Sequence, residues 1–168
     1  MSDLQTALDT HHQAVEAFLA AAHAVPAAQW GQSRAEGKWS PGQVAEHVAL
    51  AYEVSRAALR GHAPGPAAPR LLRPLIRTFL LQPILRRRRF LPGSKSPKVM
   101  QPSASPAAPS VLLGRLQAAA DAFERDASAA QAAAIDHPVF GRLPLADVVR
   151  LQEIHTQHHR GQLTPAAV

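Results

Sequence analysis

The chain has 168 residues, of which 46% are hydrophobic and only 5% aromatic, and it contains no cysteine. This length is typical of a single domain with its own core, and the lack of cysteine excludes a disulfide scaffold, a thiolate nucleophile and a cysteine-bound zinc site. The net charge is +6, but nine basic residues and no acidic one fall within 70–98, so a uniformly basic nucleic-acid-binding surface is not expected.

The alanine-rich composition favours helices over strands, and two helices are predicted in the first third of the chain. The first spans 3–23, where apolar residues recur at helical spacing, and it stops before a proline. The second spans 40–60 and has a strong start signal. Ser40 is a good N-cap, Pro41 occupies the first helical position, and Gln43 completes a capping box.

Residues 61–109 form a long connection rich in proline, glycine and arginine, in which 70–82 have the pattern of one short helix. A connection this long within a compact domain is unusual and is often functional. Two more helices are predicted over 110–134 and 144–163, with the turn DHPVFGRLP between them. The sequence therefore predicts an all-α fold, a single four-helix-bundle domain over 1–168 with a long crossover between helices two and three.

No targeting or membrane-spanning segment is predicted. The N-terminus lacks the basic region and apolar core of a signal peptide. The most apolar stretch, 79–85, is far shorter than the roughly 20 residues of a transmembrane helix, and Pro83 interrupts it. We therefore expect a cytoplasmic protein without a transmembrane segment.

Three of the nine histidines lie within five positions of the fourth predicted helix, in the sequence HTQHH. His155 and His159 are four residues apart, so their rings lie on one face of the helix, one turn apart. That spacing allows two imidazoles to bind one metal ion. His155 and His158, three residues apart, do so less commonly, and periodicity alone does not choose between the two pairs.

A third metal ligand is expected from the second predicted helix. His47 shares a face with Val44, Val48 and Ala51, so its ring points toward the core and needs a partner for its nitrogens. Histidines on two facing helices of a bundle make a metal site, and three protein ligands leave one position open, as in catalytic zinc sites. The alternative is that the cluster is polar helix surface and that His47 is a hydrogen-bonded core residue.

The remaining polar residues have weaker patterns. Four other histidines have no partner at ligand spacing and are predicted to lie on the surface: His11, His12, His23 and His62. Three residues near the ligands in the sequence are candidates for contact with them: Glu46, Glu153 and Gln162. The two glutamates are alternatively solvated charges on their helices, and Arg160 is a candidate for holding an anionic substrate group.

Three segments follow one another as WSPGQVAEHV (39–48), HPVFGRLPLADVVRL (137–151) and HTQHHRGQL (155–163). Together this ordered set resembles the DinB/YfiT-like family of metal-binding four-helix bundles. The resemblance implies an up-down-down-up bundle with its long connection between helices two and three. It also implies a divalent metal, commonly zinc or nickel, held by one histidine of helix two and an H-x-x-x-H pair of helix four: His47, His155 and His159.

The resemblance further implies a reaction class. Members with known activity mostly use low-molecular-weight thiols such as bacillithiol or mycothiol, and the family contains dimers. This implies a homodimeric metal-dependent enzyme that transfers a low-molecular-weight thiol to a small electrophile, the metal lowering the pKa of the bound nucleophile. Metal-dependent hydrolysis is the alternative reaction.

The basic segment 70–98 is not part of the resemblance and suggests a second kind of function. Its aliphatic residues and clustered arginines suit a non-catalytic, metal-stabilised module that docks on an anionic membrane surface or an acidic partner. Nucleic acid is not expected as a ligand, because only Phe79 and Phe90 are available to stack on bases. The simplest alternative is a solvated basic loop whose apolar residues cap the bundle.

Overall fold

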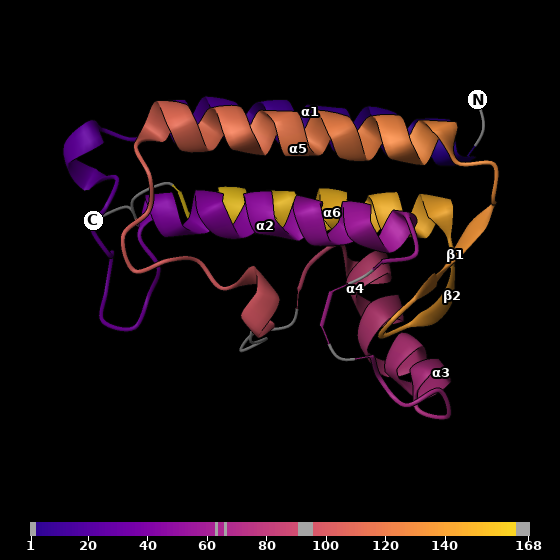
Figure 1. Ribbon diagram of the computed structural model, residues 1–168. Helices are drawn as coiled ribbons and strands as arrows, with labels where there is room; N and C mark the ends of the chain where they lie inside the picture. Colours follow the sequence, from indigo (N-terminus) through magenta and orange to yellow (C-terminus); the bar gives the residue numbers. More distant parts are fainter. Residues whose placement is uncertain (1–2, 63, 66, 91–95, 164–168) are drawn as a thin grey trace.

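A computed structural model describes residues 3–62, 64–65, 67–90 and 96–163. Over these residues the protein is predominantly helical, with one small two-stranded sheet (Figure 1). The long helices are α1 (Asp3–His23), α2 (Pro41–Leu59), α5 (Pro109–Ala129) and α6 (Leu145–Arg160), and a short 3-10 helix, η1 (Ala27–Gln29), follows α1. None of the helices in this part of the chain is both long enough and apolar enough to cross a bilayer.

The long helices lie in two layers, α1 with α5 and α2 with α6 (Figure 1). Across the layers α1 packs mainly against α6, and α2 packs mainly against α5. Helices α1 and α6 run in one direction and α2 and α5 in the other. The space between the layers is filled by one apolar cluster that includes the fully buried rings of Phe18, Tyr52 and Phe123.

The start of α2 has the predicted capping box. The Ser40 hydroxyl accepts the backbone N–H of Gln43 at 3.3 Å, and the Gln43 side chain accepts the backbone N–H of Ser40 at 3.0 Å. Such a cap is worth about 1 kcal/mol. It fixes where the helix begins, and therefore the face on which His47 lies.

The region between α5 and α6 differs from the prediction of an all-α fold. Helix α5 ends at Ala129 rather than near 134, and an antiparallel hairpin follows, formed by β1 (Ala134–His137) and β2 (Gly141–Pro144). Gly141 has φ +70°, which glycine adopts without a steric penalty and which allows the tight turn. Leu143 of β2 is buried in the core. The hairpin therefore satisfies backbone polar groups while it covers one end of the helices.

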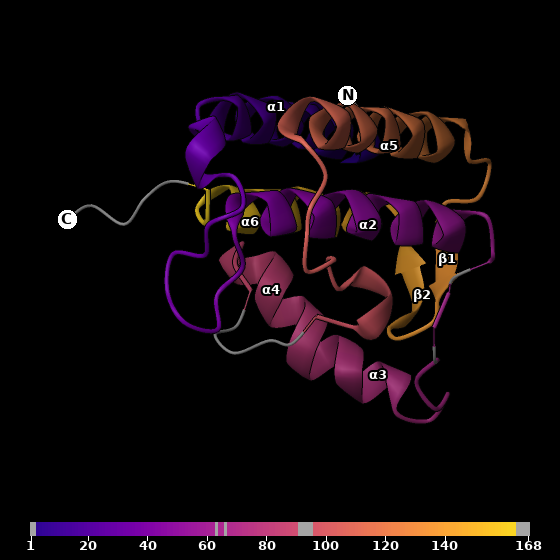
Figure 2. The same ribbon diagram turned by 60° about the vertical axis from the view of Figure 1, so that its left-hand side comes forward.

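The connection between α2 and α5 contains more helix than predicted. Helix α3 (Arg73–Ile76) continues through a π-helical segment, η2 (Arg77–Leu81), into α4 (Gln82–Arg87), and a 3-10 helix, η3 (Lys98–Met100), comes later. Pro83 does not break this helical run. It lies in the first turn of α4, directly after the wider π turn, and the first turn of a helix tolerates a residue without a backbone N–H. Figure 2 shows this helical run beneath α2 and α6, and α4 contacts α6.

Candidate metal centre

Three histidine rings from two helices converge on one point. His47 of α2 faces His155 and His159 of α6. The Nε2 atoms of His47 and His155 are 3.0 Å apart, and those of His155 and His159 are 3.2 Å apart. Nitrogens bound to one tetrahedral zinc ion are about 3.3–3.4 Å apart, given Zn–N bonds of about 2.0–2.1 Å. The three predicted ligands therefore lie together with almost the spacing that a shared metal ion requires.

Hydrogen bonds at the outer ring nitrogens assign the tautomers of two of these rings. The Nδ1 atom of His47 lies 2.7 Å from the backbone carbonyl of Met100, which can only accept, so this nitrogen carries the hydrogen. The Nδ1 atom of His159 donates in the same way to Gln162 Oε1 at 2.8 Å. In both neutral rings the inner Nε2 atom therefore presents a lone pair to the centre.

His155 lies between these two lone pairs. Its Nδ1 atom is buried and has no hydrogen-bond partner within the described ranges. If the hydrogen of His155 is on Nε2, this single N–H faces two acceptor nitrogens, those of His47 and His159. If it is on Nδ1, three nitrogen lone pairs point at one another, and a bound cation would remove their repulsion. Three neutral imidazoles are a donor set that suits zinc and nickel. The residues present therefore fit a divalent metal ion.

Burial holds the three rings in the neutral form. Burial is the main cause of a lowered pKa in all three rings. It lowers the pKa of His47, lowers that of His159 to about 3, and lowers that of His155 well below the ordinary value of 6.5. Neighbouring histidines lower the pKa of His155 and His159 further. Neutral imidazole is the form that binds metal.

Aromatic rings and the crossover enclose the cluster. The ring of Trp39 lies 4.7 Å from that of His47, and the ring of Phe90 lies 5.4 Å from that of His155. Sequence reasoning missed both aromatic residues and the Met100 carbonyl. Trp39, which directly precedes the cap of α2, was the only one with a usable signal, because a backbone carbonyl leaves no mark in the sequence.

The two glutamates proposed near the site are engaged elsewhere. Glu46 accepts hydrogen bonds from the backbone N–H and the hydroxyl of Ser103, at 3.0 and 2.7 Å. Glu153 is fully buried rather than solvated, and it accepts a hydrogen bond of 2.6 Å from Arg88 in the crossover. Burial raises the pKa of Glu153, although the Arg88 charge opposes that shift. Of the three candidates, Gln162 is the one that contacts a ligand, and Arg160 is exposed.

Of the four histidines predicted to lie on the surface, three are exposed and one is buried. His12, His23 and His62 are exposed, as predicted. The prediction for His11 was wrong, because its ring is fully buried and its Nδ1 atom lies 2.7 Å from Glu124 Oε1. A half-buried carboxylate partner on α5 is a long-range contact that local spacing does not reveal. His158 is exposed and accepts a hydrogen bond of 3.3 Å from Gln162, so it lies beside the cluster.

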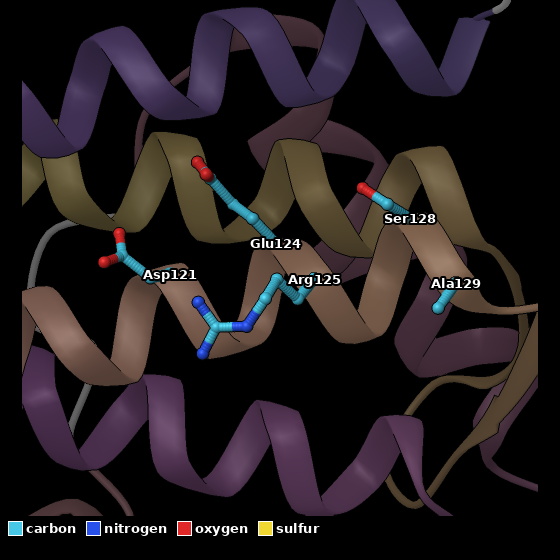
Figure 3. Close-up of a pocket in the computed structure, with 5 residues that line it drawn as sticks. All are labelled: Asp121, Glu124, Arg125, Ser128 and Ala129. Carbon is cyan, nitrogen blue, oxygen red and sulfur yellow. The ribbon is translucent and has the colours of Figure 1, made fainter.

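A separate depression lies on the outer face of α5. It is lined by Asp121, Glu124, Arg125, Ser128 and Ala129, whose side chains Figure 3 shows. None of the three clustered histidines lines it. Its charged side chains have both signs, and it does not adjoin the candidate metal centre.

The fold and the site together define a predominantly helical protein with a three-histidine cluster of metal-ligand geometry. Residues 8–166 match the family described as "Protein of unknown function (DUF1569)". Because that match covers nearly the whole chain, the protein belongs to this family. No curated protein and no solved structure matches the chain.

Proposed function

We propose that the protein binds one divalent metal ion, zinc or nickel, through His47, His155 and His159. One observation carries the proposal: two Nε2 lone pairs, fixed by hydrogen bonds to Met100 and Gln162, point at a third imidazole about 3 Å away. Three protein ligands leave a position for a small molecule on the ion, which is the arrangement of catalytic sites.

We also infer that the protein is a relative of the DinB/YfiT-like proteins. The helix directions, the long connection between α2 and α5, and the placement of the histidines on α2 and α6 support this relationship. The long helices are then an up-down-down-up four-helix bundle to which the β1–β2 hairpin is added. A homodimer in the cytoplasm is part of the same proposal.

The proposed reaction is the transfer of a low-molecular-weight thiol to a small electrophile. A bound divalent ion supplies Lewis acidity that lowers the pKa of a thiol at its open position. Because the chain has no cysteine, this thiol comes from a co-substrate. Trp39 and Phe90 place apolar rings beside the histidines.

Hydrolysis is the second candidate reaction, and the carboxylates favour thiol transfer over it. Activation of a metal-bound water commonly uses a nearby carboxylate as general base. Glu46 is held by Ser103 and Glu153 by Arg88. A thiol, with an ordinary pKa near 8.5 for the cysteine type, needs less help to ionise than water does.

The metal content of tag-free protein tests the binding step. We expect about one zinc or nickel ion per chain in the wild type by mass spectrometry, and none in His47→Ala or His159→Ala. His158→Ala is the matched control. We expect this variant to keep its metal, because the His158 ring contacts Gln162 and is not one of the three rings that converge. No metal in the wild type after zinc and nickel are offered, or equal retention in all variants, would falsify the proposal.

Activity is tested separately with metal-loaded protein. Loss of free thiol is followed with a low-molecular-weight thiol and a small electrophile, and ester hydrolysis is followed in parallel. Thiol consumption that needs both the metal and His159 supports the transfer reaction. Ester turnover without thiol consumption replaces it with hydrolysis.

A further inference from the structure

The turn at 70–72 and the helical run that follows it display large apolar side chains that the core does not use. The exposed fractions are 90% for Leu71, 47% for Leu72, 55% for Leu75 and 73% for Phe79. Leu72, Leu75 and Phe79 follow helical spacing, so they share one face of the run that begins at α3. We call these four residues the apolar face. Large exposed apolar side chains gathered on one short segment mark an interaction site more often than scattered single residues do.

The same run is anchored by its other side. Leu81 and Ile84 are buried, and α4 contacts α6. The α3 end projects away from the long helices (Figure 2). The segment is therefore amphipathic: one side holds it to the body of the protein, and the apolar face is left for a partner.

Unneutralised arginines flank the apolar face. Arg73 pairs with Asp136, and Arg88 pairs with Glu153. Four more arginines are exposed, and none of them has an ion-pair partner within the described parts of the chain: Arg70, Arg86, Arg87 and Arg89. Basic residues close to an anionic lipid surface contribute about 1 kcal/mol each to binding.

The exposed apolar side chains and the unpaired arginines together indicate what kind of partner binds this surface. A second copy packed symmetrically through this face would bring two sets of arginines together, which costs free energy. Nucleic acid would neutralise the arginines but leave Leu71, Leu75 and Phe79 in water. An anionic bilayer accepts both, because leucine and phenylalanine enter the acyl boundary while arginines meet the phosphates.

We propose that the apolar face, with the arginines at its two ends, docks the protein peripherally on an anionic phospholipid bilayer. This function is additional to the proposed metal chemistry and does not depend on it. It concerns residues 70–90, whereas the histidine ligands lie on α2 and α6.

Co-sedimentation with phosphatidylcholine vesicles, with and without phosphatidylglycerol, tests the proposal across a salt series. We expect binding only to vesicles that contain phosphatidylglycerol, with an affinity that falls as salt rises. The double variant Leu71→Ser/Phe79→Ser should bind about tenfold more weakly or worse. Val111→Ser is the matched control. Val111 is also an exposed apolar residue, 64% exposed, but it lies on α5, so this variant should bind vesicles like the wild type.

Three results would overturn the proposal. One is no binding to anionic vesicles at low salt, and another is equal binding to neutral vesicles. The third is unchanged vesicle binding in the double variant. A change from dimer to monomer by light scattering in that variant would then assign the apolar face to self-association. Vesicle binding is also measured for His159→Ala. Retained binding in that variant supports docking even where the metal proposal fails.

Discussion

Two buried histidine sites in the same helical body have opposite internal chemistry. At one, His11 of α1 pairs with the carboxylate of Glu124 on α5. At the other, His47, His155 and His159 face one another, and no carboxylate hydrogen-bonds to them within the described residues. Burial alone therefore says little about the role of a histidine. The role depends on the partner of the ring. An imidazole beside a carboxylate has its hydrogen-bond partner within the protein, whereas clustered imidazoles have nitrogen lone pairs that a cation can bind.

The pKa shifts around the two sites follow this difference. Burial raises the pKa of Glu124, but hydrogen bonds and charges from His11 and His12 outweigh it and lower the pKa overall. The hydrogen bond to Glu124 raises the pKa of the exposed His12. In the three-histidine cluster burial lowers every histidine pKa. The carboxylate site thus favours a charged Glu124 beside a charged His12, and the cluster favours neutral imidazoles.

The largest expected effect that separates the two sites is stabilisation by metal. Zinc at about 1,000 times its dissociation constant should raise the free energy of unfolding by about 4 kcal/mol. His159→Ala should lose this increase. His11→Asn should keep it, although its metal-free protein should be less stable than the metal-free wild type, because His11 contacts Glu124 and is not in the three-histidine cluster. Thermal unfolding with zinc or with a chelator measures both. An equal increase in His159→Ala would remove the distinction between the sites.

A smaller effect concerns Gln162, the residue that orients the proposed metal ligand His159. Gln162→Ala removes the acceptor of His159 Nδ1–H and should weaken metal affinity by about 10–100-fold. Competition with a chromophoric chelator measures the change. Gln157→Ala, an exposed position on α6, is the control and should bind metal like the wild type. Equal affinities for both variants would mean that Gln162 does not position the ligand.

The smallest effect is the pH dependence of the carboxylate site. The folded pKa of Glu124 is below its ordinary value of 4.5, so its stabilisation is present above that value and is lost as pH falls. The folded pKa of His12 is above 6.5, so its stabilisation is present below that value and is lost as pH rises through the folded pKa. Glu124→Gln should therefore cost most between about pH 5 and 6.5, on the order of 1 kcal/mol.

Urea denaturation at acidic and alkaline pH measures this dependence. The difference between wild type and Glu124→Gln should shrink above the folded pKa of His12. Glu36→Gln, at an exposed position in the loop before α2, is the control. A difference that is constant with pH would show that Glu124 acts through packing and not through its charge.

The sequence predicted the parts of the site that local patterns determine. The capping box at Ser40 and the spacing of His155 and His159 place the three histidines on the faces of α2 and α6 that meet at the cluster. Helix bounds were close, because apolar periodicity and proline positions are local signals. That α2 and α6 would bring these faces together was an expectation from facing helices and from the family resemblance, not from spacing.

The remaining features depend on contacts between distant residues. The pairs His11–Glu124 and Arg88–Glu153 join positions 113 and 65 residues apart. The hairpin at 134–144 replaced an expected helix end, because Gly141 allows a turn that packs Leu143 into the core. Tertiary contacts overrode local preference at each of these positions.

The hydrogen bond from His47 to the Met100 carbonyl joins a proposed metal ligand to the crossover that also carries the apolar face. Movement of the crossover at Met100 on docking would therefore act on the His47 ring. By linkage, whatever factor a bilayer adds to metal affinity, metal must add to bilayer affinity. A factor of one would leave the two proposed sites independent, whereas any other factor would make membrane-bound and free copies of the protein differ in metal occupancy at the same metal concentration.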